Sequence, residues 1–164
     1  MVRGWAFPAL AVALLAACAS TAPEPGHAGA DRPRIGAKQS LELYPNETPE
    51  LRALIVAAAA RYDVPLTLVQ RLVIRESRHR PGARNGPYYG LLQIHPSTAR
   101  TMGYRGSDKG LLDAETNLEY GVKYLRGAWL VAEGDPDEAI GWYARGYYYE
   151  AKRKGLLRET GLKG

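Results

Sequence analysis

The sequence predicts a mainly α-helical domain with at most a small extended β segment, and three observations support this fold class. From about residue 49, apolar residues recur at intervals of three and four, the spacing of one helix face. Prolines and capping residues mark the beginnings of most of these stretches, and runs typical of strands are scarce. With 164 residues, 46% hydrophobic and 24% charged, the chain can form one globular domain plus short extensions.

The first two predicted helices lead to a glutamate in an unusual place. Thr48 is expected to cap a helix that begins at Pro49 and ends near Tyr62. Pro65 opens a second helix. Its apolar stripe consists of Leu68, Val69, Leu72 and Val73. Glu76 continues this stripe, so its carboxyl group is expected to face the apolar side of the helix.

The rest of the chain continues the helical pattern after one irregular stretch. A loop rich in proline and glycine covers residues 81–87, and one short extended pair is predicted within residues 84–94. The remaining helices are predicted at residues 96–103, 113–134, 135–143 and about 147–154, with a loop between the first two. Asp113 and Asp135 are the expected caps of the two long ones.

The amino-terminal part of the chain predicts export and a lipid anchor. Residues 1–17 carry Arg3 and an apolar run that is too short to span a bilayer and typical of a signal peptide. The run ends in Leu15-Ala16-Ala17-Cys18, which resembles the lipobox of bacterial lipoproteins, so Cys18 is the expected lipidation site. The alternative is a thiol removed with the signal peptide. Cys18 is the sole cysteine, so no internal disulfide can form.

The segment after the cysteine is expected to be a flexible tether. Residues 18–48 are rich in small residues and proline, and a domain is expected over residues 49–164. Leu41, Leu43 and Tyr44, near the end of the tether, are expected to pack onto that domain. An exported lipoprotein belongs to the bacterial cell envelope. Ser20, in the absence of an aspartate beside the cysteine, favours an outer-membrane anchor with the protein facing the periplasm.

The charge of the chain limits its partners. A formal charge of +5 suits an anionic cell-wall polymer or a phospholipid surface. No long basic run is present, so nucleic acid is not an expected partner. His27, His79 and His95 lack partners at ligand spacing, so no metal is expected, and no cofactor either.

Glu76 has the placement that acid catalysis requires. A carboxyl group that loses part of its water retains its proton to higher pH, as a general acid must. The alternative is a structural ion pair with one of the nearby arginines, which are Arg71, Arg75, Arg78 and Arg80. Helix geometry directs most of these away from Glu76.

Three ordered blocks resemble the lytic transglycosylases of the soluble-lytic-transglycosylase type. The first is Glu76-Ser77 followed by Gly90-Leu91-Leu92-Gln93. The second runs from Asp113 to Leu125, and the third is Trp142-Tyr143-Ala144-Arg145-Gly146. The resemblance covers about residues 49–155. It implies a lysozyme-like fold and non-hydrolytic cleavage of the β-1,4 bond between N-acetylmuramic acid and N-acetylglucosamine in peptidoglycan, with 1,6-anhydro ends as products.

The resemblance also implies roles for individual residues. Glu76 would protonate the leaving oxygen and then deprotonate the C6 hydroxyl of the substrate. Gln93 would bond to Glu76 or to a sugar amide, Gly90 would let the backbone approach the sugar, and Tyr143 would place a hydroxyl near the acid. The other expected substrate contacts are Ser77, Tyr89 and Leu92.

Three departures from the family pattern put details of substrate binding in doubt, and one of them is a loop between Glu76 and Gly90 that is one residue shorter. Leu92 replaces a methionine, and Ala144 replaces an asparagine after the tyrosine. One alternative is a hydrolytic muramidase, which would need an aspartate such as Asp108 or Asp113. A peptidoglycan-binding scaffold lipoprotein without activity is the other alternative.

Overall fold

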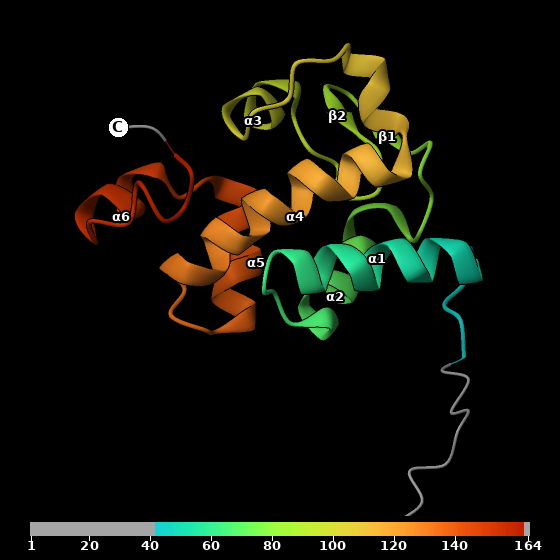
Figure 1. The fold of residues 1–164 in the computed structure, drawn as a ribbon, viewed down its shortest axis with the longest axis horizontal. Helices are drawn as coiled ribbons and strands as arrows, with labels where there is room; N and C mark the ends of the chain where they lie inside the picture. Colours follow the sequence, from blue (N-terminus) through green and yellow to red (C-terminus); the bar gives the residue numbers. More distant parts are fainter. Residues whose placement is uncertain (1–41, 163–164) are drawn as a thin grey trace, which may run out of the picture. The chain divides into compact units, whose positions relative to one another are not determined.

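The structure, a computed structural model, describes residues 42–162 of the chain. Within these residues there are six α-helices, one 3₁₀ helix and one two-stranded sheet (Figure 1). The α-helices are α1 (Pro49–Arg61), α2 (Leu66–Ser77), α3 (Pro96–Thr101), α4 (Ala114–Val131), α5 (Pro136–Arg145) and α6 (Tyr148–Arg153). The 3₁₀ helix is η1 (Asp108–Leu112), and the strands are β1 (Arg84–Asn85) and β2 (Tyr88–Tyr89). The predicted fold class is confirmed.

The predicted amino-terminal features fall mostly outside this part of the chain. The signal peptide, Cys18 and the tether up to residue 41 lie outside the described residues. Among residues 42–162, no helix is both long enough and apolar enough to cross a membrane.

The ends of α1 and α2 follow from their sequences. The Thr48 hydroxyl oxygen accepts a hydrogen bond from the backbone N–H of Leu51 at 3.2 Å, and Pro49 occupies the first turn of α1. Helix α2 follows Pro65 and ends at Ser77, and its C-cap residue Arg78 has a left-handed φ of 52°. The predicted helices therefore have nearly the observed boundaries.

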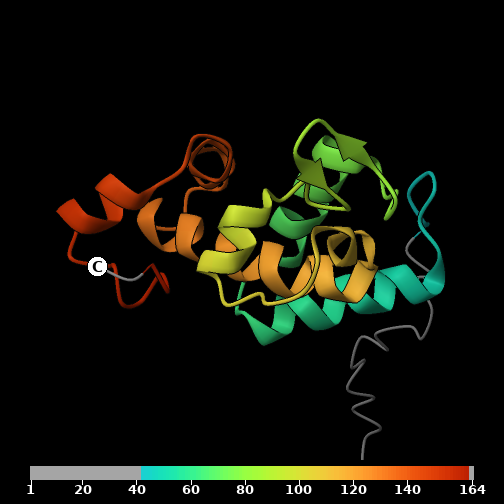
Figure 2. The same cartoon turned by 90° about the horizontal axis from the view of Figure 1, so that it is seen from above.

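Helix α4 is the central helix of the domain. It contacts α1, α3, α5 and η1, and in Figure 1 it runs between α1 and the segment that holds α3 and the strands. Leu118, Val122 and Leu125 of α4 belong to the same hydrophobic core as the buried stripe of α2. Each large apolar side chain buried in this way contributes about 1.5–3 kcal/mol. Figure 2 shows α6 at one end of the domain and the beginning of α1 at the other.

A second, smaller core lies under the two strands. Strands β1 and β2 pair antiparallel, with Arg84 opposite Tyr89 and Asn85 opposite Tyr88. The second core consists of Tyr89, Ile94, Ala99, Tyr104 and Leu111. Leu111 is the one buried residue of η1, which forms in the stretch expected to be a loop. A single buried residue gives the sequence no period from which a helix could be predicted.

Candidate active site

A continuous cleft passes the end of α2. Its first part, the acid hollow, has a volume of about 330 Å³. The acid hollow is lined by Arg75, Glu76, Asn85, Tyr88, Gln93, Tyr143 and Ala144. Its second part, the distal hollow, has a volume of about 380 Å³ and extends past α3 and the end of α5. The two hollows share Tyr88, Gln93, Tyr143 and Ala144, so an elongated ligand can occupy both.

Glu76 lies in the last turn of α2, where the buried stripe of the helix meets the cleft. Its side chain is 22% exposed, and no hydrogen bond to its carboxylate occurs among residues 42–162. Burial raises the pKa of Glu76 above its ordinary value, although the nearby charge of Arg75 opposes this effect. Glu76 is therefore a carboxyl group that retains its proton better than an exposed glutamate does.

The four arginines near Glu76 differ in where they lie. The Arg75 Nε atom is 3.5 Å from a Glu76 carboxylate oxygen, so Arg75 is not among the arginines, most of the four, that were expected to point away. Arg71 pairs with Asp137 on α5 at 2.5 Å, and the Arg80 Nε donates to the carbonyl oxygen of Ser77 at 3.0 Å. The Arg75 contact is long and its side chain is half exposed, so this pair is weak.

Tyr143 lies beside the acid, as the resemblance implies. Its ring is buried, and its hydroxyl donates a hydrogen bond to the carbonyl oxygen of Leu92 at 2.9 Å. Burial raises the pKa of Tyr143 far above 10, and the charge of Glu76 raises it further. Tyr143 is therefore a neutral hydroxyl that ties α5 to the loop after β2 at the wall of the acid hollow.

Gln93 lines both hollows, but its amide serves the loop. The amide nitrogen donates to the carbonyl oxygens of Ala83 at 3.1 Å and Gly90 at 2.9 Å. Of the two partners expected for Gln93, Glu76 forms no hydrogen bond with it between these described residues, and the bond to a sugar amide stays a prediction. The amide oxygen of Gln93 is the atom that could accept a hydrogen bond from a ligand.

Asn117 holds this loop, and sequence reasoning gave it no role. Its side chain is fully buried and accepts a hydrogen bond from the N–H of Leu92 at 2.8 Å. The amide nitrogen donates to the carbonyl oxygens of Tyr89 and Leu111, each at 2.8 Å. A neutral polar residue beside the apolar stripe of a long helix was the available signal.

The backbone conformation of Gly90 and its close contact with Asn117 explain why a glycine stands at this position. Its φ is 73°, a conformation that favours glycine, and an added Cβ would lie 2.3 Å from the Asn117 amide nitrogen. Gly90 is buried and lines neither hollow. The structure therefore gives Gly90 a role in packing the loop, and its approach to the sugar stays a prediction.

Three other expected substrate contacts lie behind the cleft wall. Leu92 is fully buried in the main core, and Tyr89 is 7% exposed in the second core. Ser77 is buried, and its hydroxyl donates to the carbonyl oxygen of Val73 at 3.2 Å. Tyr88, the exposed neighbour of Tyr89, is the tyrosine of β2 that lines the cleft. Adjacent strand residues point to opposite faces, and the sequence alone did not settle which of the two faces outward.

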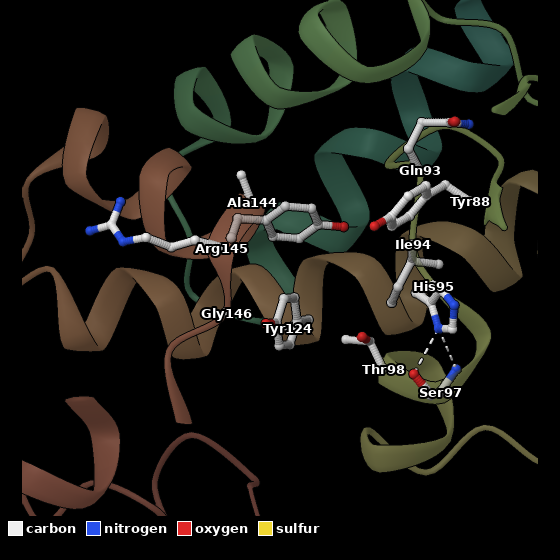
Figure 3. A pocket seen from close by; sticks show the side chains of 11 residues that line it. Tyr88, Gln93, Ile94, His95, Ser97, Thr98, Tyr124, Ala144, Arg145 and Gly146 are labelled. Carbon is white, nitrogen blue, oxygen red and sulfur yellow. Dashed lines mark hydrogen bonds between the residues drawn. The ribbon is translucent and has the colours of Figure 1, made fainter. Parts of the chain in front are cut away.

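The distal hollow combines aromatic and polar side chains. Figure 3 shows Tyr88, His95, Ser97 and Thr98 on one side, with Tyr124 below Ala144. A His95 ring nitrogen accepts from the N–H of Ser97 at 3.1 Å, which fixes the ring at the start of α3. Figure 3 also shows the side chain of Arg145 pointing away from the other lining residues, and its guanidinium lies 3.8 Å from the centre of the Trp142 ring.

A mainly helical domain with a small sheet and one half-buried glutamate at its cleft defines a lysozyme-like protein. The chain belongs to the family described as Transglycosylase SLT domain, whose family model matches residues 53–159, more than half of the chain. This match confirms the resemblance predicted from the three blocks. The lipoprotein form stays a prediction. A search of curated proteins finds no match to the chain.

Proposed function

We propose that this protein is a peptidoglycan lytic transglycosylase that cleaves the β-1,4 bond between N-acetylmuramic acid and N-acetylglucosamine without using water. The observation that carries the proposal is the single carboxylate of the cleft. Among the described residues that line the two hollows, Glu76 is the one acid. Most glycoside hydrolases need two carboxyl groups that flank the scissile bond. A cleft with one suits a reaction in which the substrate supplies its own nucleophile.

The proposed reaction uses Glu76 twice. Its carboxyl group donates a proton to the glycosidic oxygen as the bond between that oxygen and C1 of the muramic acid breaks. The resulting carboxylate then takes the proton of the C6 hydroxyl of the same sugar, whose oxygen forms a new bond to C1. The product is a 1,6-anhydro ring, and Glu76 regains its proton. The substrate's own N-acetyl group is the proposed stabiliser of positive charge at C1.

A hydrolytic muramidase is less well supported. The two aspartates that the sequence offered for this route are engaged elsewhere. Asp108 pairs with Arg100, and Asp113 caps α4 by accepting the N–H of Thr116 at 2.8 Å. Neither lines the acid hollow or the distal hollow.

A scaffold without activity is also less well supported. Ala144, which motivated this alternative together with Leu92, is exposed on the wall shared by both hollows. The smaller side chain leaves the acid hollow open, and the raised pKa of Glu76 through burial is a property that acid catalysis uses.

Muropeptide analysis tests the proposed reaction. The protein is incubated with purified peptidoglycan, and the released fragments are weighed beside those from a Glu76→Gln control. From the wild type we expect fragments that are lighter by one water than the products of hydrolysis. From the control we expect none, because removing the general acid should lower activity at least about a hundredfold. Ordinary reducing ends would identify a hydrolase. Binding without release would favour the scaffold.

We also propose that Cys18 carries a lipid anchor that holds the protein in the cell envelope, facing the periplasm. The support is the Leu-Ala-Ala-Cys sequence at the end of the apolar run. In fractionated cells, the wild type should sediment with the membranes and a Cys18→Ala variant should be released. A variant that stays with the membranes would exclude this anchor.

A further inference from the structure

Three residues that precede α1 contact α2 and the turn that follows it. They are Tyr44, Asn46 and Glu47, here called the clasp. The sequence placed all three in the tether and predicted that Tyr44 packs onto the domain, which it does by stacking on His79. Glu47 is 7% exposed although it lies outside every helix and strand. The family match begins at residue 53, so the clasp is additional to the matched domain.

Glu47 is the centre of the clasp. Its carboxylate accepts hydrogen bonds from Arg52 at 2.6 Å and 2.5 Å, from the Gln70 amide at 3.0 Å and from the N–H of Tyr44 at 3.0 Å. Burial opposes ionisation, but these donors outweigh it and lower the pKa of Glu47 from 4.5 to about 2. Glu47 is therefore a permanent buried anion that joins the clasp to α1 and α2.

The contacts continue from Glu47 to His79, two residues after the end of α2. The Gln70 amide nitrogen donates to Glu47, so its oxygen must accept, and the His79 Nε2–H donates to it at 2.9 Å. His79 is 1% exposed, and its ring stacks on Tyr44 with ring centres 5.3 Å apart. Tyr44 thus covers the face of the His79 ring, and Glu47 holds the edge of the ring through Gln70.

The backbone that the clasp holds is in an unfavourable conformation. Arg78 and His79 have φ values of 52° and 58°, two consecutive left-handed residues that carry a Cβ. The Asn46 side chain donates to the carbonyl oxygen of Arg78 at 3.1 Å, within this strained turn. Such conformations persist where surrounding contacts determine them, and they are frequent at active sites. Glu76 lies two residues before Arg78.

We propose that the clasp positions the last turn of α2 and thereby Glu76, so that Glu47 and Asn46 are positioning residues for the reaction. The inference rests on the proposed role of Glu76 as the acid. With the clasp in place, the turn at Arg78 and His79 ends α2 and leads the chain away from the helix axis. This turn keeps Glu76 against the cleft wall. Without it, the strained turn relaxes and Glu76 gains water.

Two variants of the full chain test the clasp. Glu47→Gln removes the buried anion. Asn46→Gly removes one hydrogen bond and retains the φ of 65° that Asn46 adopts, because glycine accepts that conformation. For both variants we expect kcat on peptidoglycan to fall about tenfold or more at nearly unchanged KM, since small misplacements of a catalytic group are costly. The alkaline limb of the pH profile should move to lower pH as Glu76 becomes better hydrated.

A matched control separates positioning from stability. Glu119 also ties elements together, because it accepts from Arg61 at 2.7 Å and from the Tyr62 hydroxyl, but it lies on α4. Glu119→Gln should lower the melting temperature and leave kcat and the pH profile as in the wild type. Folded clasp variants with wild-type kcat and pH profile would overturn the inference. If Glu47→Gln does not fold, Asn46→Gly decides.

An NMR titration keeps this test independent of the proposed function. The Glu76 carboxyl signal, assigned with Glu76→Gln, is titrated in the wild type and in Asn46→Gly. A lower pKa of Glu76 in the variant supports the clasp even if the wild type releases no anhydro product, a result that would refute the proposed function alone. An equal pKa in both proteins, together with equal kcat where activity exists, overturns the clasp.

Discussion

Two glutamates near the end of α2 differ in what surrounds them. Glu47, the buried member of the clasp, accepts four hydrogen bonds from three residues. Glu76 is half-buried at the acid hollow and has one arginine at 3.5 Å. The pKa of Glu47 is lowered to about 2, whereas burial raises the pKa of Glu76. The more buried carboxyl group is thus the stronger acid.

The comparison shows that donors, and not burial alone, decide the charge of a buried carboxyl group. Burial disfavours the ion in both places, but only Glu47 has hydrogen-bond donors within the described chain that compensate for it. A permanent anion is suited to holding structure together. A carboxyl group without such donors is suited to exchanging a proton.

Replacing each glutamate by glutamine should change stability in opposite directions at pH 7. Glu47→Gln leaves Arg52 without its anionic partner and should lower the free energy of unfolding by about 3 kcal/mol. Glu76→Gln removes a charge that burial disfavours and should raise that free energy by less than about 1 kcal/mol. Urea unfolding at pH 7 measures both.

The pH dependence of the Glu47 effect has a defined sign. Because the folded pKa of Glu47 is about 2 and its ordinary value is 4.5, its stabilisation is present above pH 4.5 and disappears as the pH falls to 2. The wild type should therefore lose its advantage over Glu47→Gln across this interval. Glu133→Gln, which removes an exposed partner of Lys154, is the control and should change little. If Glu47→Gln and Glu76→Gln shift the free energy of unfolding in the same direction, the contrast between the two sites is wrong.

The sequence predicted the fold well because its signals are local. Thr48, Asp113 and Asp135 each cap the helix that they were expected to cap. Periodicity defined the buried side of α2, including the end at which Glu76 meets the cleft. Helix η1 was missed because its one buried residue, Leu111, has no local partner and packs against residues from β2 and α3.

The candidate site was predicted less completely because its geometry depends on long-range hydrogen bonds. Asn117 organises the loop from positions 25 and 28 residues away along the chain, and its place beside the apolar stripe of a helix does not reveal these partners. Glu47 was assigned to a tether because composition says nothing about Gln70 and His79, which reach it from α2 and beyond. The motifs identified the residue types at the site, but the fold determines which of these side chains line the cleft.

Arg75 tests the contrast between the two glutamates most finely. It is a nearby cation that lowers the pKa of Glu76, as Arg52 does for Glu47. Its charge opposes the effect of burial on the pKa of Glu76, so Arg75→Gln should help Glu76 retain its proton. The alkaline limb of kcat/KM should then move to higher pH, opposite to the direction expected for the clasp variants. Half-exposed pairs contribute about 0.2–1 kcal/mol, which corresponds to a few tenths of a pH unit.

Arg71→Gln, one turn earlier on α2 and paired with Asp137, is the control and should leave the alkaline limb in place. An unmoved limb in Arg75→Gln would mean that water screens this pair completely, and that burial alone sets the proton affinity of Glu76.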